Sequence, residues 1–231
     1  MVSLRHQMSR FWTDDKGLSA FLGLLLLTTF VLPPFFQPRG TGRALVDIVF
    51  CLVLVGGALT APLHRRVGWF IAAVGLVATL ARVLDWTFAS NYFKTPTAVS
   101  TLVTLVLLAI VVLAQVLRSG PVTIHRIVGA IAAYILFGLS WGFAYQVVEA
   151  LAPGAFKGLA AEYGARDLIY YSFVTLTTIG YGDITPVHNT ARSLAMLEGL
   201  TGQLYPAILV ARLVSLEVQS RTPPSAGGNR P

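Results

Sequence analysis

Residues 177–183 have the sequence Thr-Thr-Ile-Gly-Tyr-Gly-Asp. Gly180 and Gly182 alternate in it with bulky isoleucine and tyrosine side chains. Glycine adopts left-handed backbone conformations without strain, so this alternation allows successive carbonyl groups to turn toward one side of the chain. The preceding apolar segment, residues 167–176, is long enough for about three helical turns and too short to span a bilayer.

The composition is that of a membrane protein. Of the 231 residues, 55% are hydrophobic and only 12% are charged, and the mean hydropathy is +0.70. A soluble domain of this length needs more charge on its surface. A bilayer core about 30 Å thick requires roughly 20 apolar residues per helix. The segments that meet this requirement are residues 18–36, 44–61, 67–88, 97–117, 126–149 and 192–216.

The predicted fold class is therefore an all-α integral membrane protein with six transmembrane helices. The short helix and loop would be a re-entrant element between the fifth and sixth helices, because non-helical backbone at membrane depth is tolerated only where it is buried or lines water. With the N-terminus inside, ten Lys and Arg residues fall on the inner side and six on the outer side. This bias predicts two cytoplasmic termini and an outward-facing segment 150–190.

The first apolar segment has an alternative interpretation as a signal peptide. Its apolar stretch is long, however, and ends in a Pro-Pro-Phe-Phe-Gln-Pro-Arg sequence that lacks the small residues of a cleavage site. A multi-pass protein of the plasma membrane is the preferred interpretation. Short loops without glycosylation or disulfide signals favour a prokaryotic source.

The alternating stretch has the composition that an ion filter requires. A dehydrated cation needs oxygen atoms in place of its water shell, and backbone carbonyls that face a pore axis supply them. Thr178 would add a hydroxyl oxygen at the inner end, while Ile179 and Tyr181 would turn outward and pack against the short helix. One loop cannot encircle an ion and the chain has one copy, so a homotetramer is implied.

This motif and its setting resemble the signature of the potassium channel family. The resemblance is strong over residues 126–216 and rests on count and topology over the first four helices. It implies passive, selective K⁺ conduction, with K⁺ as the permeant ion at the filter and no other metal or cofactor. Carried over residue by residue, it implies ion coordination by Thr178, Ile179, Gly180, Tyr181 and Gly182.

Neighbouring residues are expected to support the filter. By the resemblance, Asp183 lies at the outer mouth and accepts a hydrogen bond from an aromatic donor of the short helix, either Tyr170 or Tyr171. Val174 stands where some bacterial relatives carry a glutamate, so a buried carboxylate pair is absent. The other supporting residues are Thr175 and Thr177.

The sixth helix is expected to line the cavity and to bend. Gly199 and Gly202 are hinge candidates, although close helix packing explains them equally well. Pro206 removes a helix hydrogen bond and predicts a kink. With Gln203 and Val210 it forms one face of the helix, which would line the cavity.

Charges inside membrane helices need partners, because each costs at least about 2.5 kcal/mol there. Glu198 is expected either to hydrogen-bond Thr175 or Tyr171, on the same or a neighbouring subunit, or to be a protonated structural residue. Asp47 and Arg82 share a depth and are expected to form a buried pair, with Asp85 as a second partner of Arg82. A structural bridge is the preferred role, and a moving sensor charge is the alternative.

The resulting division places a cytoplasmic N-terminus at 1–17, a four-helix domain similar to a voltage sensor at 18–118, and a linker at 119–125. The pore domain follows at 126–219 and a disordered tail at 220–231. Residues 97–117 contain no Lys or Arg, so the fourth helix lacks the arginine array of voltage sensors and steep voltage gating is not expected.

Other functions remain open at this point: a non-selective cation channel, or a silent or regulatory channel subunit. A transporter would show internal repeats, and an enzyme would cluster its ionisable residues; neither pattern is seen, so no enzyme activity is predicted. The net charge of +7 comes from scattered basic residues, which argues against nucleic acid. The expected partners are further copies of this chain and the lipid bilayer, with no soluble partner evident.

Overall fold

The computed structural model describes residues 15–35, 73–80, 91–117, 123–160 and 164–221. The first helical stretch comprises α2 (Asp15–Leu26), the π-helical turn η1 (Leu27–Val31) and α3 (Leu32–Phe35), and it includes both Pro33 and Pro34. The predicted second helix, 44–61, lies outside the described residues. Of the predicted third helix, residues 73–80 are described, and they are helical.

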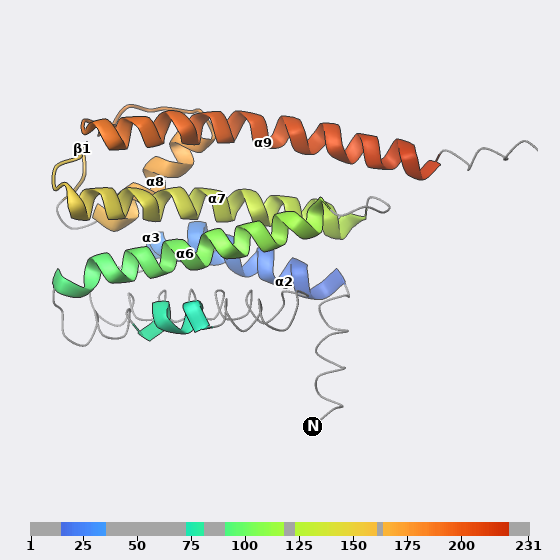
Figure 1. The fold of residues 1–231 in the computed structure, drawn as a ribbon, viewed down its shortest axis with the longest axis horizontal. Coiled ribbons are helices and arrows are strands. Elements are labelled where there is room, and N and C mark those ends of the chain that lie inside the picture. Colours follow the sequence, from blue (N-terminus) through green and yellow to red (C-terminus); the bar gives the residue numbers. More distant parts are fainter. Residues whose placement is uncertain (1–14, 36–72, 81–90, 118–122, 161–163, 222–231) are drawn as a thin grey trace, which may run out of the picture.

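Three long helices run along the longest dimension of the molecule (Figure 1). They are α6 (Asn91–Val116), α7 (Ile124–Leu151) and α9 (Asn189–Arg221). Segments of 22, 28 and 30 residues within them are long and apolar enough to cross a membrane, whereas Ser19–Phe35 is a shorter apolar helix. α7 and α9 extend beyond the predicted spans at both ends, and α6 begins before its predicted start, because helical hydrogen bonding continues past the apolar stretch that hydropathy detects.

Between α7 and α9 lies the short helix α8 (Gly164–Leu176), as predicted from its length and sequence (Figure 1). A small antiparallel pair, β1 (Phe156–Lys157) with β2 (Thr185–Pro186), joins the segment before α8 to the segment that follows the loop after α8. The fold is therefore mostly helical, with one two-residue ladder that the all-α prediction did not include.

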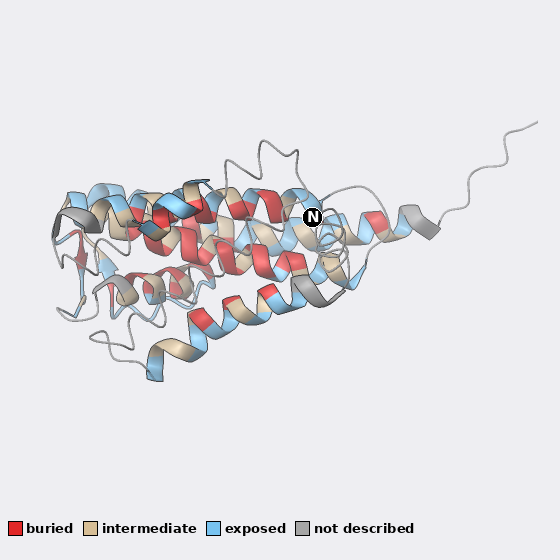
Figure 2. Ribbon diagram, turned by 90° about the horizontal axis from the view of Figure 1, so that it is seen from below, coloured by how far each residue is buried: buried red, intermediate tan, exposed pale blue. Residues whose placement is uncertain are grey.

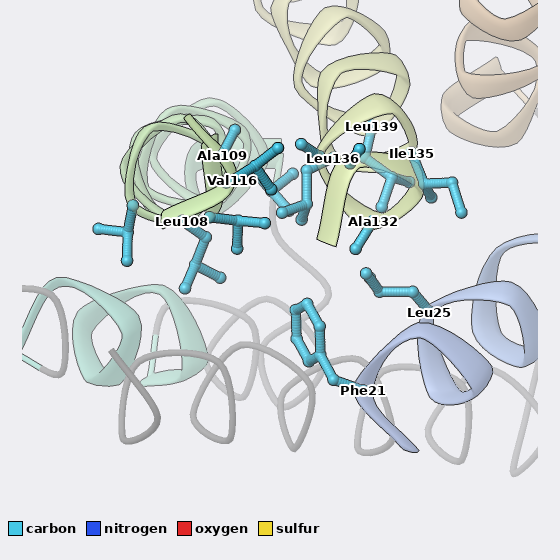
Figure 3. Packing of buried hydrophobic residues seen from close by; sticks show 14 of the residues in the cluster. Phe21, Leu25, Leu108, Ala109, Val116, Ala132, Ile135, Leu136 and Leu139 are labelled. Carbon is cyan, nitrogen blue, oxygen red and sulfur yellow. The ribbon is translucent and has the colours of Figure 1, made fainter. Parts of the chain in front are cut away.

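The main core lies where α7 meets α2 and α6 (Figure 3). Phe21 and Leu25 from α2 pack against Leu108 of α6 and Leu136 of α7, and each of these side chains is at most 4% exposed. Small residues such as Ala132 keep the helices close. This core fixes the position of α7, and α8 packs against α7.

In contrast, α9 is largely exposed in the single chain (Figure 2). Only 11% of its membrane-length segment is buried, against 61% for α7. Its large apolar side chains on the exposed surface, each more than half exposed, are Met196, Leu197, Leu200, Leu204, Ile208, Val210, Val214 and Val218. Within the described residues, the face that these side chains form has no partner in the same chain.

Candidate functional site: the loop between α8 and α9

Two glycines of α7 set the position of α8. A Cβ atom added at Gly138 would lie 2.5 Å from the ring of Phe173, and one added at Gly142 would lie 2.9 Å from the Cα of Ile169. Glycines one helical turn apart form a groove into which another helix can approach closely. The sequence Gly-Leu-Ser-Trp-Gly therefore positions α8, and through it the loop that follows.

The loop backbone alternates in hand. Thr178, Gly180 and Gly182 have φ values of +60°, +60° and +80°, while Ile179 and Tyr181 between them do not have positive φ. Left-handed conformation was expected at the two glycines. It is unexpected at Thr178, because a residue with a branched Cβ is strained there. The alternation thus continues through the non-glycine end of the motif.

Hydrogen bonds to the last turn of α8 hold the inner end of this loop. The Val174 carbonyl accepts from the amides of Ile179 at 2.9 Å and Gly180 at 3.3 Å. The Thr175 carbonyl accepts from the Thr178 amide at 2.9 Å. The Thr177 hydroxyl donates to Phe173 O at 2.6 Å. The loop is therefore continuous with the helix end and not a free surface turn.

At the outer end, the Tyr170 hydroxyl donates to Asp183 Oδ2 at 2.8 Å. The other candidate donor, Tyr171, lies elsewhere: its ring packs edge-to-face with Tyr145 and Phe156, with centroids 5.1 and 5.3 Å away. The two adjacent tyrosines point to different sides of α8, because successive helical residues are about 100° apart.

The side chains of Ile179 and Tyr181 are 54% and 69% exposed in the single chain. We expected them to pack against α8, and within one chain this burial is not seen. The physical reason is that the described part of a single chain leaves the outer side of the loop open.

On α9, Gln203 faces the loop: its Nε2 donates to Thr178 Oγ1 at 3.1 Å. Pro206 and Val210 are exposed, as is Gln203, and α9 remains helical through Pro206. The two hinge candidates differ. A Cβ at Gly202 would overlap the carbonyl oxygen of Leu176, whereas one at Gly199 would meet nothing within 4 Å. The structure thus gives Gly202 a packing role against the end of α8.

Glu198 is fully buried, at 0% exposure. The Tyr145 hydroxyl from α7 lies 2.5 Å from its Oε2, and the Ser172 hydroxyl from α8 lies 2.5 Å from its Oε1. Within one chain the partners of Glu198 are therefore Tyr145 and Ser172, and not the expected Thr175 or Tyr171. The predicted link from the sixth helix to the short helix does exist, through Ser172.

Sequence reasoning missed Tyr145, Ser172 and Tyr134. The Tyr134 hydroxyl donates to Leu176 O at 3.2 Å, at the inner end of α8. The signal available in the sequence was the presence of isolated polar groups in apolar helices, which need partners in a membrane. The predicted charged cluster of Asp47, Arg82 and Asp85 lies outside the described residues.

The described residues contain no group of three or more His, Cys, Asp or Glu side chains that could hold a metal ion. The loop supplies backbone carbonyl oxygens and the Thr178 hydroxyl, which are groups of the kind that can replace the water shell of a cation. A short helix and a backbone loop between two membrane-length helices define the pore element of a membrane channel.

Comparison with known proteins gives the same class. Residues 133–219 match a family model described as an ion channel. The chain is 34% identical to the inward rectifier potassium channel Kirbac3.1 of Paramagnetospirillum magnetotacticum over 110 residues, which are 47% of this chain and 33% of the relative. It is 46% identical over 49 residues to Protein LctB of Geobacillus stearothermophilus, covering 21% of this chain and 36% of the relative.

The matched segments span about a third of the length of these curated relatives. No solved structure matches the chain. Residues 133–219 thus resemble an ion-channel domain, and this similarity points to a channel rather than an enzyme. The predicted resemblance to the potassium channel family is confirmed for this part of the chain.

Proposed function

We propose that the chain is one subunit of a homotetrameric channel that conducts K⁺ passively and selectively through residues 178–182 of each copy. The observation that supports this most directly is the alternation of left-handed residues at 178, 180 and 182. Alternation of hand is the conformation that can direct successive carbonyl oxygens toward one axis, where they replace the water shell of a cation. The similarity to a protein named as a potassium channel supports the choice of ion.

The tetrameric assembly is supported by what one chain leaves uncovered. The side chains of Ile179 and Tyr181 are exposed, and so are the large apolar side chains of α9, the helix that follows the loop. These apolar side chains are available for contact with a neighbouring copy as well as with lipid. Neighbouring copies would cover them and would complete the ring of oxygens that one loop cannot form.

The end of α8 supports cation selectivity further. α8 ends at Leu176, directly before the loop. The C-terminal end of a helix carries partial negative charge, which stabilises a nearby cation. In the proposed orientation both termini are cytoplasmic, and the fourth helix, without basic residues over 97–117, does not sense voltage steeply.

Planar-bilayer recording of the purified protein under opposed K⁺ and Na⁺ gradients tests the proposal. We expect current that reverses near the K⁺ equilibrium potential. Gly180→Ala should abolish selective current, because its φ of +60° is strained for a residue with a Cβ. Gly23→Ala is the matched control, since Gly23 lies on α2 with nothing within 4 Å of an added Cβ.

A reversal potential near zero with either cation would indicate a non-selective channel. Normal K⁺ current in Gly180→Ala would show that the filter lies elsewhere. Absence of current from the pure protein, with current on mixing with another channel chain, would indicate a regulatory subunit.

A further inference from the structure

A second polar site lies away from the filter, where the end of α6 meets the start of α7. A cavity of about 160 Å³ is lined there by the polar side chains of Gln115, His125 and Arg126, and by three apolar residues, Val112, Val116 and Gly129. A single water needs only about 10–15 Å³ of such space. The cavity can therefore hold a group of several heavy atoms.

The chemistry of the lining is that of an anion site. The guanidinium of Arg126 places its Nη1 in the interior, where, among the residues that the structure describes, it has no hydrogen-bond partner. Buried donors without a partner are rare, because leaving one unsatisfied is unfavourable. All three polar side chains can donate hydrogen bonds, and no residue in this lining is acidic. A ligand rich in acceptor oxygens would satisfy Arg126 Nη1.

Two further features specify the ligand. A guanidinium is a planar fork of donors that matches the oxygens of a phosphate or carboxylate group. The N-cap Thr123 makes no side-chain cap to the first turn of α7, whose positive end also favours an anion.

The cavity lies at the level of a membrane boundary. The membrane-length segment of α6 ends at Val116, and that of α7 begins at Ile124, two residues before Arg126. Apolar Val112 and Val116 therefore adjoin the donors on the side of the hydrocarbon. An amphipathic ligand, with an anionic headgroup beside acyl chains, matches this arrangement.

We propose that this cavity binds a phosphate group, and that its position at the membrane boundary selects the headgroup of an anionic phospholipid. The bound phosphate would join the ends of α6 and α7 through Gln115 and Arg126. The phosphate would thus connect α6 to α7 at a site separate from the loop between α8 and α9.

Thermal unfolding of the full-length protein in detergent tests the proposal. The probes are dioctanoyl phosphatidylglycerol, dioctanoyl phosphatidylcholine and inorganic phosphate, since a ligand that binds the folded state raises the midpoint. We expect phosphatidylglycerol to raise it in the wild type at concentrations where phosphatidylcholine does not. Arg126→Gln should weaken this response by at least about ten-fold in apparent affinity, because it removes the charge-assisted bonds.

Arg212→Gln is the matched control, because it removes one positive charge from an exposed position on α9 and should leave the response intact. Arg126→Lys keeps the charge without the planar fork and should give an intermediate affinity, and it remains a test should Arg126→Gln fail to fold. A response to phosphatidylglycerol alone identifies the lipid headgroup as the source, and an Arg126-dependent response to inorganic phosphate as well identifies a general phosphate site.

Equal responses of Arg126→Gln and Arg212→Gln would overturn the proposal, as would equal responses of the wild type to the two lipids. Because the readout is binding and not current, the outcome is independent of the proposed function. Selective current without Arg126-dependent binding removes this inference alone, and binding without current removes the channel proposal alone.

Discussion

Glu198 contacts two hydroxyl groups, and one of them has a further acceptor. The Ser172 hydroxyl lies 2.7 Å from Gly138 O as well as beside Glu198 Oε1, and the Tyr145 hydroxyl lies beside Oε2. A hydroxyl carries one proton. Three contacts therefore require three protons, of which Tyr145 and Ser172 supply two. A protonated Glu198 supplies the third, donating to Ser172 while Ser172 donates to Gly138 O.

This proton count predicts that Glu198→Gln is tolerated. The amide matches a neutral carboxylic acid, because its NH₂ can donate to Ser172 while its oxygen accepts from Tyr145. Glu198→Ala should instead lower the free energy of unfolding by roughly 2–5 kcal/mol, since it leaves a cavity and two buried hydroxyls unsatisfied. Thermal unfolding followed by tryptophan fluorescence measures both variants.

Tyr145→Phe is the matched partner variant, and the double variant with Glu198→Ala completes a cycle that isolates the coupling between the two residues. A Glu198→Gln variant as unstable as Glu198→Ala would indicate that the carboxylate is ionised, and the proton count would then be wrong.

At Gly202, the amount of space around the α-carbon decides the outcome of substitution. A Cβ would overlap Leu176 O, a backbone atom that cannot rotate away. Gly202→Ala should therefore lower stability by about 1–3 kcal/mol through overpacking. Gly199→Ala, three residues earlier with nothing within 4 Å, should leave stability unchanged or raise it by up to about 1 kcal/mol through helix propensity. Chemical denaturation of the two variants in parallel gives the comparison, and equal stabilities would reject the packing role.

Among the elements, α8 depends most on its contact with α7. Gly138 faces the end of the Phe173 ring, a side chain, whereas Gly142 faces the Cα of Ile169, which is backbone. Gly138→Ala should thus be rescued by Phe173→Leu, which shortens the side chain. Gly142→Ala should not be rescued by Ile169→Val, because the backbone contact remains. The midpoint of thermal unfolding of the single and double variants measures the rescue, and rescue at both positions would show that α8 shifts as a rigid unit.

The same elements show what can be predicted from sequence. Segment lengths and hydropathy predict α6, α7 and α9, and the motif at 177–183 predicts the loop and the short helix before it. The partners of Glu198 were not predictable in this way. In a helix that is apolar all round, the pattern does not indicate which side faces its neighbours. An error of one helix face exchanges Ser172 for Tyr171, and Tyr145 belongs to a different helix about fifty residues away.

Positive φ at Thr178 was also missed, for a related reason. The glycines at 180 and 182 predict left-handed backbone there, whereas a threonine at 178 does not. Two hydrogen bonds hold Thr178 in this conformation. Its backbone amide donates to Thr175 O at the end of α8, and its hydroxyl accepts from Gln203 of α9. Tertiary contacts can impose a conformation that a residue would not choose by itself.

At the scale of the whole molecule, the proposed tetrameric filter predicts that K⁺ and assembly stabilise each other, because a single loop would leave the ring of oxygens incomplete. An ion that binds only the assembled filter stabilises the assembly by mass action, by about 2.7 kcal/mol at a hundred times its dissociation constant. Replacing Na⁺ by K⁺ at constant ionic strength should therefore raise the unfolding midpoint of the detergent-purified protein. Native mass spectrometry of the same sample should give four times the 24.8 kDa subunit mass.

The Gly180→Ala variant should have the same unfolding midpoint in K⁺ and in Na⁺, whereas Gly23→Ala should keep the higher midpoint in K⁺. Of these two glycines, Gly180 is the one with a left-handed backbone in the proposed filter. A monomer that unfolds at the same temperature in both salts would contradict the link between filter and assembly.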